Sequence, residues 1–317
     1  MTSLRWKKLK EIWVYNMKLT ILGCYSATPR TNTNPTAQVL EMSNRMFLID
    51  CGEGTQVQLR RNKLKFSKIK HIFISHLHGD HYFGLVGLIS TFRLLGREAD
   101  LHIYGPKGLE EVIVLQMKLG DSWTNYKLTF HELTSTESEL IYEDEKVEVH
   151  TIPLDHRVYT NGFLFKEKEH ERKLIIGKVE DANINVAYYR KLKQGFDVEN
   201  EDGVLIKNEE VTIAGPKPKS YAYCSDTAYN EAIVPIINNA DLLYHESTFL
   251  DKLAHLATKT KHSTAKQAAT IAKEANVKNL MLGHFSTRYE DVSEFKTEAQ
   301  EVFENVIIAE EGKTFEF

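Results

Sequence analysis

The sequence predicts a mixed α/β fold built as one large domain. Its 317 residues are 42% hydrophobic and 26% charged, a composition that suits a globular chain with a sizeable core. Short β-rich runs alternate with helical patterns along most of the chain. This alternation indicates sheets covered by helices, and glycine-turned strand pairs near both ends indicate sheets of mixed strand direction.

The strands are predicted by runs rich in β-branched and aromatic residues that end at turn residues. They cover residues 18–23, 37–42, 46–50, 70–75, 101–104, 147–154, 162–166, 220–225, 241–245 and 279–283. The helices are predicted by helical spacing of apolar residues, over 54–63, 84–96, 107–119, 186–193, 229–238, 264–275 and 291–304. Ser263 or Thr264 is placed to cap the helix over 264–275, and Asp291 the helix over 291–304.

Composition and charge narrow the class of protein. The chain carries 40 Lys and Arg against 44 Asp and Glu, and the formal net charge of −4 by itself counts against an RNA partner. The longest apolar runs, such as residues 83–89, are far shorter than the ~18–20 residues of a membrane helix. Three cysteines fit free buried thiols, and the N-terminal stretch lacks the apolar region of a secretory signal. We therefore expect a cytoplasmic protein without a membrane span.

Two segments depart from the regular alternation. Met17 stands directly before the first strand, so residues 1–16 are expected to be an appendage to a domain over 17–317. Residues 166–219 hold two charged clusters and then a stretch rich in Gly, Asn and Glu, with few apolar anchors after Tyr189. This composition is typical of a solvated surface insertion.

One short run points to metal chemistry. The run HLHGDH, from His76 to His81, follows a predicted strand and offers four potential ligands within six residues. A loop at a strand end can fold such donors toward one point, and Gly79 is expected to permit a tight turn there. Three further donors, His156, Asp226 and His284, each follow another predicted strand.

Together these donors are sufficient for two metal ions. The candidate ligands are His76, His78, Asp80, His81, His156, Asp226 and His284. Five histidines and two aspartates can hold two zinc ions if one carboxylate bridges them. Spacing alone does not say which ligand binds which ion.

These motifs resemble those of a known family. HLHGDH followed by single His, Asp and His ligands resembles the HxHxDH signature of the metallo-β-lactamase superfamily. The segments LDHRVYTNGF, SDT, HESTF, HSTAKQAA and LGHFSTRY are similar, in order and spacing, to the motifs of the ribonuclease Z family. The likeness runs from about Met17 to near Phe317 and implies a four-layer αββα sandwich with an inserted flexible arm. It also implies a zinc-dependent endoribonuclease that removes the 3′ trailer from precursor tRNA and leaves a 3′-hydroxyl.

The resemblance implies a role for each ligand. Each zinc ion would have three ligands of its own and would share Asp226 as a bridge. The implied partition is His76, His78 and His156 for one ion, and Asp80, His81 and His284 for the other. Asp80 would also orient the attacking water or accept its proton. Manganese remains an alternative, because imidazole and carboxylate ligands admit several ions.

The same resemblance implies a proton donor for the leaving ribose oxygen. Glu246 and His262 would form a carboxylate–imidazole relay, in which Glu246 orients and charge-stabilises His262, the general acid. His245, next to Glu246, is expected to be structural. His262 lies among lysines just before a predicted helix, so a surface histidine is the competing interpretation.

Residues around the site receive supporting roles. Ser286 and Arg288 would face phosphate, although an ion pair of Arg288 with Glu290 or Asp291 is an equally good interpretation. Asp50 would hold a metal-binding loop rather than a metal. No role is predicted for the remaining histidines, His71, His102, His131, His150, His170 and His255.

The arm and one loop bear on the RNA. Residues 166–219 correspond in position to the arm with which the family grips tRNA, and Arg190, Lys191 and Lys193 are candidates to meet phosphates there. In the family the arm of one subunit serves the site of the other, which implies a homodimer. The stretch TPRTNTNPTAQ departs from the family loop associated with refusing CCA-bearing tRNA, and Arg30 and Asn34 are its candidate substitutes.

Two other functions stay open at the level of sequence. The first is another dinuclear hydrolase of the superfamily, a phosphodiesterase, lactonase, thioesterase or arylsulfatase-like enzyme. The second is a non-catalytic RNA-binding protein that kept the fold. The HEST and HST motifs and the arm argue against the first, and a full set of ligands and relay residues argues against the second.

Overall fold

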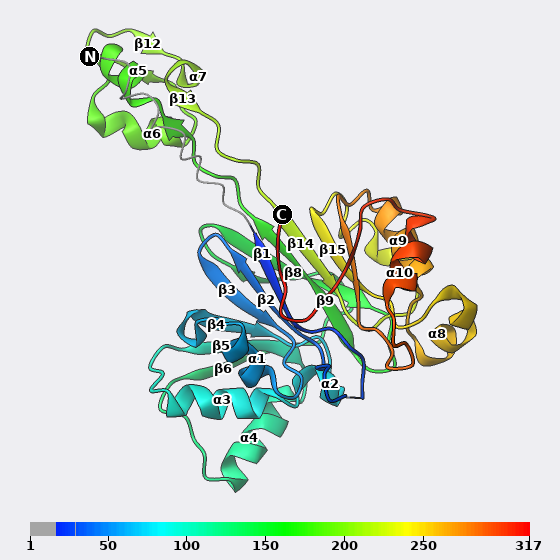
Figure 1. Cartoon of the computed structure of the whole chain (residues 1–317). Helices are drawn as coiled ribbons and strands as arrows, with labels where there is room; N and C mark the ends of the chain where they lie inside the picture. The colour runs from blue at the N-terminus through cyan, green and yellow to red at the C-terminus, as the bar shows by residue number, and fades with distance from the viewer. Residues whose placement is uncertain (1–16, 29) are drawn as a thin grey trace, which may run out of the picture. The chain divides into compact units, whose positions relative to one another are not determined.

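The structure is a computed structural model, which describes residues 17–28 and 30–317. The predicted appendage, residues 1–16, lies outside the described residues. The described chain divides into two compact units, one formed by Glu167–Pro218 and the other by residues 17–166 and 219–317. Figure 1 shows the chain from its N-terminal strand, β1, to the C-terminus, and each unit is described separately below.

The larger unit contains two seven-stranded sheets. The first has the order β18 (Thr314–Glu316), β1 (Lys18–Gly23), β2 (Ala37–Met42), β3 (Arg45–Ile49), β4 (Ile69–Phe73), β5 (Leu101–Pro106) and β6 (Leu128–Leu133). Its strands are antiparallel from β18 to β3 and parallel from β3 to β6. The predicted mixture of strand directions is therefore confirmed.

The second sheet precedes three of the four loops that carry candidate ligands. Its order is β17 (Val306–Ile308), β16 (Leu280–Gly283), β15 (Leu242–Glu246), β14 (Ser220–Cys224), β9 (Thr160–Glu167), β8 (Val147–Leu154) and β7 (Leu140–Glu143). Strands β14 to β17 are parallel, so the loops that follow them leave at one edge of the sheet.

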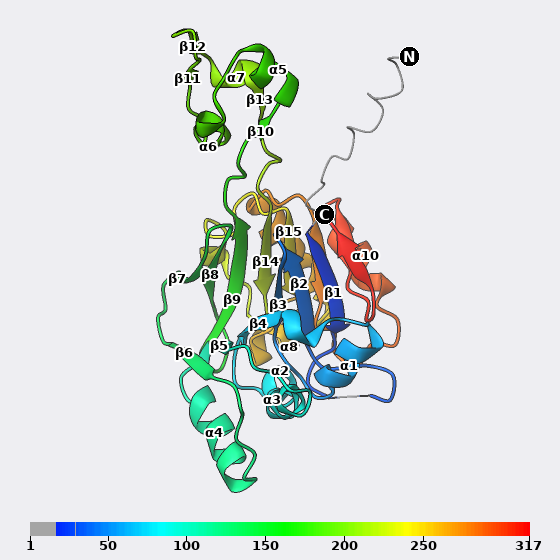
Figure 2. The same cartoon turned by 90° about the vertical axis from the view of Figure 1, so that its left-hand side faces the viewer.

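Helices cover the outer face of each sheet, as Figures 1 and 2 show. On the first sheet they are α1 (Thr55–Arg61), α3 (Leu85–Leu94) and α4 (Leu109–Leu119), and on the second α9 (Ala265–Glu274) and α10 (Ser293–Gln300). Alternate residues of a strand serve different cores, since Val39 packs under these outer helices whereas Leu40 packs between the sheets. The four-layer αββα sandwich is confirmed.

The N-terminal ends of α9 and α10 each bind a side chain that was predicted to be a cap. Thr264 caps α9 with a capping box, in which its side chain accepts from the Gln267 N–H and the Gln267 side chain accepts from the Thr264 N–H. The Asp291 carboxylate accepts hydrogen bonds from the backbone and the hydroxyl of Ser293, the first residue of α10. Thr264 is therefore the N-cap of α9, as predicted, whereas Asp291 lies one residue before Val292, the N-cap of α10, and binds the first residue of that helix.

One predicted helix is wrong, and several short elements were missed. Residues 229–238 form only a 3₁₀ turn, Glu231–Ile233, because Asn230 caps that turn and Pro235 cannot continue a helix. In the larger unit, the helices and strands that the sequence did not predict are α2 (Gly79–Tyr82), α8 (Ala254–Thr260), β6, β7, β17 and β18. All but α8 and β6 have four residues or fewer, too few for a periodic pattern to show.

The smaller unit has a core of its own, contrary to the expectation of a segment with few apolar anchors. It contains α5 (Ile176–Asp181), α6 (Tyr189–Lys193), α7 (Asn208–Val211) and the strand pairs β10 (Lys173–Leu174) with β13 (Thr212–Ile213) and β11 (Val198–Glu199) with β12 (Leu205–Ile206). Its buried core is Val179, Ile184, Leu192, Val198 and Val211. These apolar residues stand singly along a charged segment, so they form no periodic pattern in the sequence. They come together only when the short helices and strands of this unit pack against one another.

Two predictions from composition can be compared with the structure. Cys24, Cys51 and Cys224 are free and buried, and burial raises the pKa of each thiol, so all three are poor nucleophiles. Within residues 17–28 and 30–317, no helix is long and apolar enough to cross a membrane.

Three histidines without a predicted role form a stack on the first sheet. His71, His102 and His131 lie on the neighbouring strands β4, β5 and β6, with ring centroids 5.2 Å and 5.3 Å apart. Burial, followed by the charges of the other two histidines, lowers the pKa of His71 to about 4. Asp144 opposes this shift and Lys70 adds to it.

This stack predicts acid-sensitive stability. Between pH 6.5 and 4, His71 binds a proton in the unfolded chain but not in the folded chain. The folded state is therefore destabilised relative to the unfolded state as the pH falls through this range. The free energy of unfolding, measured with urea, should fall over this pH range by up to about 3 kcal/mol more in wild type than in His71→Phe. Because both proteins share every other titrating group, identical pH dependence would contradict the prediction.

Candidate active site

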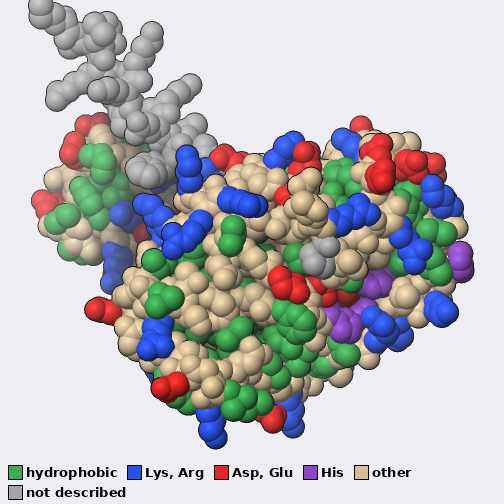
Figure 3. Space-filling view, turned by 60° about the horizontal axis from the view of Figure 1, so that its bottom comes forward, with side chains coloured by type: hydrophobic (Ala, Val, Ile, Leu, Met, Phe, Trp, Pro, Cys, Tyr) green, Lys and Arg blue, Asp and Glu red, His purple; other side chains and the backbone are tan. Residues whose placement is uncertain are grey.

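The candidate ligands lie on loops that follow strands of both sheets. His76, His78, Asp80 and His81 follow β4, His156 follows β8, Asp226 follows β14 and His284 follows β16. Four of them, His78, Asp80, Asp226 and His284, border a cavity of about 550 Å³. In the surface view a group of histidine side chains shows on one face, with acidic and basic side chains beside it (Figure 3).

Gly79 was expected to permit a tight turn, but the structure gives it a different role. It begins α2 and is not among the residues with positive φ, so no special turn conformation requires glycine there. A Cβ atom at this position would lie 2.2 Å from the Phe83 ring. The absence of a side chain therefore allows Phe83 to pack against the start of α2.

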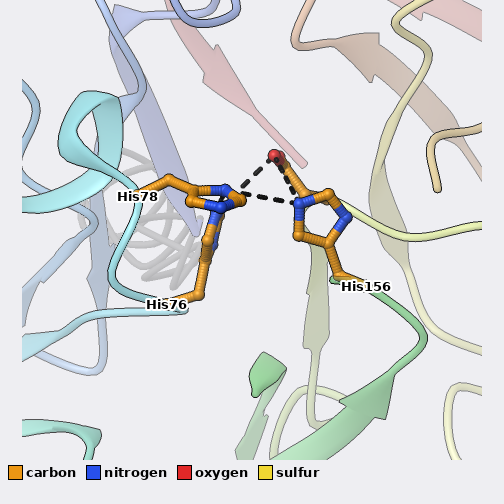
Figure 4. Close-up of side chains that lie close together, drawn as sticks. His76, His78 and His156 are labelled. Carbon is orange, nitrogen blue, oxygen red and sulfur yellow. Dashed lines mark hydrogen bonds and ion pairs between the residues drawn. The ribbon is translucent and has the colours of Figure 1, made fainter. Parts of the chain in front are cut away.

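One group of donors consists of His76, His78, His156 and Asp226. His78 Nδ1 lies 3.0 Å from His76 Nε2 and 3.3 Å from His156 Nε2. Asp226 Oδ2 lies 3.6 Å from His76 Nε2 and 3.7 Å from His156 Nε2. Figure 4 shows the three rings turning these nitrogens toward one another. Three imidazole nitrogens and a carboxylate oxygen at this spacing can hold one metal ion.

A second group consists of Asp80, His81 and His284. Asp80 Oδ2 lies 3.5 Å from His81 Nε2 and 3.7 Å from His284 Nε2. Asp226 Oδ1 lies 3.4 Å and 3.1 Å from the same two nitrogens. Although both nitrogens are buried beside carboxylates, neither makes a hydrogen bond within the described part of the chain. Buried polar atoms normally have a partner, so a cation fits between these groups.

The outward nitrogen of His81 is fixed by Asp50. Asp50 is fully buried, and its Oδ2 accepts hydrogen bonds from His81 Nδ1 at 2.7 Å, the Ser75 hydroxyl at 2.9 Å and the Tyr223 hydroxyl at 2.6 Å. Since Tyr223 belongs to β14, these bonds join the two sheets directly behind the second group. Asp50 thus occupies the supporting position that the resemblance implied, and it leaves Nε2 of His81 directed at the cluster.

Two other histidines are held in the same way. His156 Nδ1 donates to the carbonyl of Lys261 at 2.8 Å, and His284 Nδ1 lies 2.9 Å from Thr248 Oγ1. Lys261 is also ion-paired with Asp155, at 2.5 Å, so the loops of His156 and His262 are tied together. No sequence pattern predicted these backbone and hydroxyl partners.

The electrostatics of the cluster suit a cation. Burial lowers the pKa of His76, of His78 and of His156, which keeps these imidazoles neutral, as metal ligands must be. Burial opposes the charged form of Asp226, but His284 and His81 outweigh it and hold the pKa of Asp226 well below its usual range.

The second group, Asp80, His81 and His284, has more negative charge around it than the first and so favours a cation more strongly. Burial disfavours a protonated His81, but the carboxylates of Asp226, Asp80 and Asp50 outweigh it and raise the pKa of His81 well above its usual value. Burial likewise opposes ionisation of Asp80, and the charge of His81 overcomes it and holds the pKa of Asp80 well below its usual range. Three carboxylates around one imidazole can be balanced by a proton or by a metal ion.

Glu246 and His262 form a buried pair. Glu246 Oε1 accepts from His262 Nδ1 at 2.8 Å and from the Ser263 N–H at 3.0 Å, while Oε2 accepts from the N–H and the hydroxyl of Thr248, both at 2.8 Å. Although burial opposes charge on both residues, their mutual attraction lowers the pKa of Glu246 and raises the pKa of His262 to about 9. His262 is therefore an imidazolium in a built site, and the surface-histidine interpretation is wrong.

His262 also approaches the second group of candidate ligands. Its ring stacks on that of His284 with centroids 5.5 Å apart, and Asp226, His262 and His284 form a third group of donor atoms within 4.8 Å of one another. His245, by contrast, is buried and donates from Nδ1 to the carbonyl of Glu246.

Cations line the same cavity. Ser286, Arg288 and Arg157 border it, and no described residue forms an ion pair with either arginine. The expected alternative, an ion pair of Arg288 with Glu290 or Asp291, is not found among the described residues. Sequence reasoning missed Arg157, for which the signal was its place beside His156 in the motif LDHRV.

The N-terminal loop is anchored at the edge of the cavity. The Asn34 N–H and Nδ2 donate to the two carboxylate oxygens of Glu311, both at 2.6 Å, and Asn34 Oδ1 accepts from Gln58 at 2.7 Å. The Ala27 N–H donates to Asp80 Oδ2 at 2.8 Å. Asn34 is therefore engaged in holding the loop, whereas the side chain of Arg30 is exposed.

Comparison with known proteins identifies the family. A ribonuclease Z from Bacteroides fragilis is 48% identical over 295 residues, which cover 93% of this chain and 97% of the relative. A ribonuclease Z from Bacteroides thetaiotaomicron is 49% identical over 295 residues, 93% of each chain. The chain belongs to the ribonuclease Z family. It is therefore a hydrolytic endoribonuclease, as the sequence motifs implied.

Solved structures agree with the ribonuclease Z fold. Human tRNase Z, short form, is 28% identical, with a TM-score of 0.69 over 94% of this chain and 98% of that chain. The metallo-β-lactamase fold protein YhfI from Bacillus subtilis, at 21% identity, shows the fold alone, with a TM-score of 0.67 over 95% and 99% of the two chains.

A family model described as anti-Pycsar protein Apyc1 matches residues 17–196. This is more than half of the chain, which therefore also belongs to the family that this model describes. The matched segment contains HLHGDH and His156 but ends before Asp226, Glu246 and His262. The ribonuclease Z relatives extend across the complete site, so they bear on its second half as well.

The geometry around His262 predicts that it is not a required ligand. Its Nδ1 is committed to Glu246, and the second group already has three donors besides Asp226. Metal analysis should therefore find the full metal content in His262→Ala, with a turnover at least about 100-fold lower. His284→Ala is the matched control and should lose about one ion per chain. Loss of an ion from His262→Ala would instead place His262 in the ligand set.

Proposed function

We propose that this ribonuclease Z family member removes the 3′ trailer of precursor tRNA by hydrolysis at two metal ions. Water attacks the scissile phosphorus and the bond to the ribose 3′-oxygen breaks, so the tRNA keeps a 3′-hydroxyl and the trailer a 5′-phosphate. The observation that carries the proposal is the arrangement of seven donors, five of them buried, in two groups that meet at Asp226, beside the Glu246–His262 pair.

The ligand sets follow from this arrangement. One ion would be held by His76, His78 and His156, the other by Asp80, His81 and His284, with Asp226 shared. Zinc suits this mixture of nitrogen and oxygen donors, and manganese is the alternative. Two such ions would lower the pKa of water toward ~7 and stabilise charge on the attacking and leaving oxygens.

Protein side chains move the protons. Asp80 Oδ2 lies beside both histidines of the second group and would orient the attacking water and accept its proton. His262, held as an imidazolium by Glu246, would donate a proton to the leaving 3′-oxygen. Glu246 remains ionised, since donors surround both of its oxygens, and stabilises the charge of His262.

The cavity offers contacts for the RNA backbone. Arg157 and Arg288 are exposed cations without an acidic partner among the described residues, and a phosphate can accept two hydrogen bonds from a guanidinium. The positive charge of Arg157 also acts on His78 and on His262, which supports a role for it beside the leaving oxygen. We assign Arg157 to the scissile phosphate and Arg288 with Ser286 to a neighbouring one.

The smaller unit is the proposed tRNA-binding arm, residues 166–219. Arg190, Lys191 and Lys193 are exposed on or beside α6, and none has an ion-pair partner among the described residues. Local basic charge of this kind can bind tRNA phosphates on a chain whose net charge is −4. We propose a homodimer in which each arm serves the other subunit, and we place the protein in the cytoplasm with its substrate.

The proposal predicts a specific cleavage product. Incubation with a 3′-extended precursor tRNA should release the trailer and leave a 3′-hydroxyl at the discriminator nucleotide, and a chelator should abolish cleavage until zinc or manganese is restored. Product mapping on sequencing gels checks both points. A chain that hydrolyses a small phosphodiester but leaves precursor tRNA intact would instead be another hydrolase of the superfamily.

Removal of the arm and removal of a cavity arginine should affect different kinetic constants. Deletion of residues 178–213 should raise the KM for precursor tRNA at least about tenfold and spare bis(p-nitrophenyl) phosphate, because only the RNA reaches the arm. Arg157→Gln should lower kcat/KM for both substrates about 10- to 100-fold, because both contain the scissile phosphate. The matched control is Arg93→Gln, an exposed arginine in α3 outside the cavity, which should behave as wild type.

Mixing the variants tests the arrangement of the arms. A mixed dimer of the arm deletion and His262→Ala has one intact arm and one intact site, on different subunits. If each arm serves the other subunit, this dimer should recover cleavage of precursor tRNA. Absence of recovery, with dimers verified by light scattering, would show that the arm serves its own subunit. Unchanged tRNA affinity of the arm deletion would contradict the arm proposal itself.

A further inference from the structure

The hydroxyl of Thr248 joins two parts of the site that have separate tasks. Thr248 Oγ1 lies 2.8 Å from Glu246 Oε2, 2.9 Å from His284 Nδ1 and 3.2 Å from His262 Nδ1. The side chain is buried, with 4% of the residue exposed. One oxygen atom therefore contacts a candidate metal ligand and both members of the candidate proton relay.

The hydrogen-bonding capacity of these groups fixes the direction of each bond. Glu246 receives backbone N–H groups on both oxygens, so it is an ionised acceptor. Thr248 has a single hydroxyl proton, which goes to Glu246 Oε2, an acceptor without a proton of its own. The Thr248 oxygen can then only accept from His284, whose Nδ1 must carry the proton.

We infer that Thr248 is a positioning residue that locks His284 in the tautomer with its proton on Nδ1. In this tautomer Nε2 has no proton, and its lone pair faces Asp226 Oδ1 at 3.1 Å and Asp80 Oδ2 at 3.7 Å. This is the state in which a histidine can ligate a metal ion. The inference rests on the proposed function only for the reaction that the ion serves.

The same hydroxyl supports the proton relay. By donating to Oε2 of Glu246, Thr248 helps to hold the carboxylate so that Oε1 faces His262. A continuous chain of hydrogen bonds thus runs from His284 through Thr248 and Glu246 to His262. In such a chain each bond polarises the next, so removal of the central hydroxyl weakens both ends.

The backbone keeps Thr248 and His284 facing each other. Strands β15 and β16 are parallel and pair Glu246 with Gly283, so the residues that follow leave the sheet side by side. The Ser286 N–H donates to the Thr248 carbonyl at 3.2 Å. His284 has a φ of +58°, a conformation that costs a non-glycine residue ~1 kcal/mol. This local strain is maintained by the surrounding contacts and directs the ring toward Thr248.

Thr248→Val tests the inference, because valine keeps the branched shape and removes the hydroxyl. Titration of the metal-free protein with zinc against a chromophoric chelator should show one of two sites weakened about 10- to 100-fold in Thr248→Val. Thr248→Ser retains the hydroxyl and should bind both ions like wild type. Circular dichroism establishes that each variant is folded before the titration.

A second measurement observes the tautomer in the wild-type protein itself. Nitrogen-15 NMR of metal-free wild type, with His284 assigned by its substitution, should show the His284 proton on Nδ1. A proton on Nε2 would overturn the inference, and so would normal affinity of Thr248→Val for both zinc ions. Neither measurement involves RNA, so failure of the inference is distinguishable from failure of the proposed function, which the cleavage of precursor tRNA decides.

Discussion

The site depends on the carboxylate of Asp226, which is buried between two groups of imidazoles. Its Oδ2 faces His76 and His156, and its Oδ1 faces His81 and His284. A carboxylate in such a position requires positive charge on both sides, which protons or metal ions can supply. Because His76 and His81 follow a strand of the first sheet while the other three residues follow strands of the second, the site forms only when the sandwich closes.

The surrounding hydrogen bonds leave one nitrogen free on three of the imidazoles, those of His81, His156 and His284. Asp50 takes the outward proton of His81, the Lys261 carbonyl that of His156 and Thr248 that of His284. The inward nitrogens are therefore aligned before any ligand arrives, and preorganisation of this kind is a large part of the affinity of a metal site. Catalysis and folding share these contacts, since Asp50 also joins β14 to the first sheet through Tyr223.

The sequence was most informative where function concentrates unusual residues within a short distance. HLHGDH and the motifs around Glu246 and His262 predicted the members of the site, and hydrophobic runs predicted most strands. The predicted helix over 229–238 fails because Pro235 interrupts it, and this is a signal that lies in the local sequence. The cavity that Arg157 borders and the contacts of Thr248 depend on loops far apart in the chain. No local pattern could therefore have predicted the cavity or the hydroxyl contacts.

The central claim is that Asp226 bridges two metal ions, and anomalous X-ray scattering from zinc-loaded crystals tests it most directly. We expect two peaks ~3.5–4 Å apart, one on either side of the Asp226 carboxylate. One peak should lie among His76, His78 and His156, and the other among Asp80, His81 and His284. A single peak, or a pair of peaks that Asp226 does not join, would contradict the account.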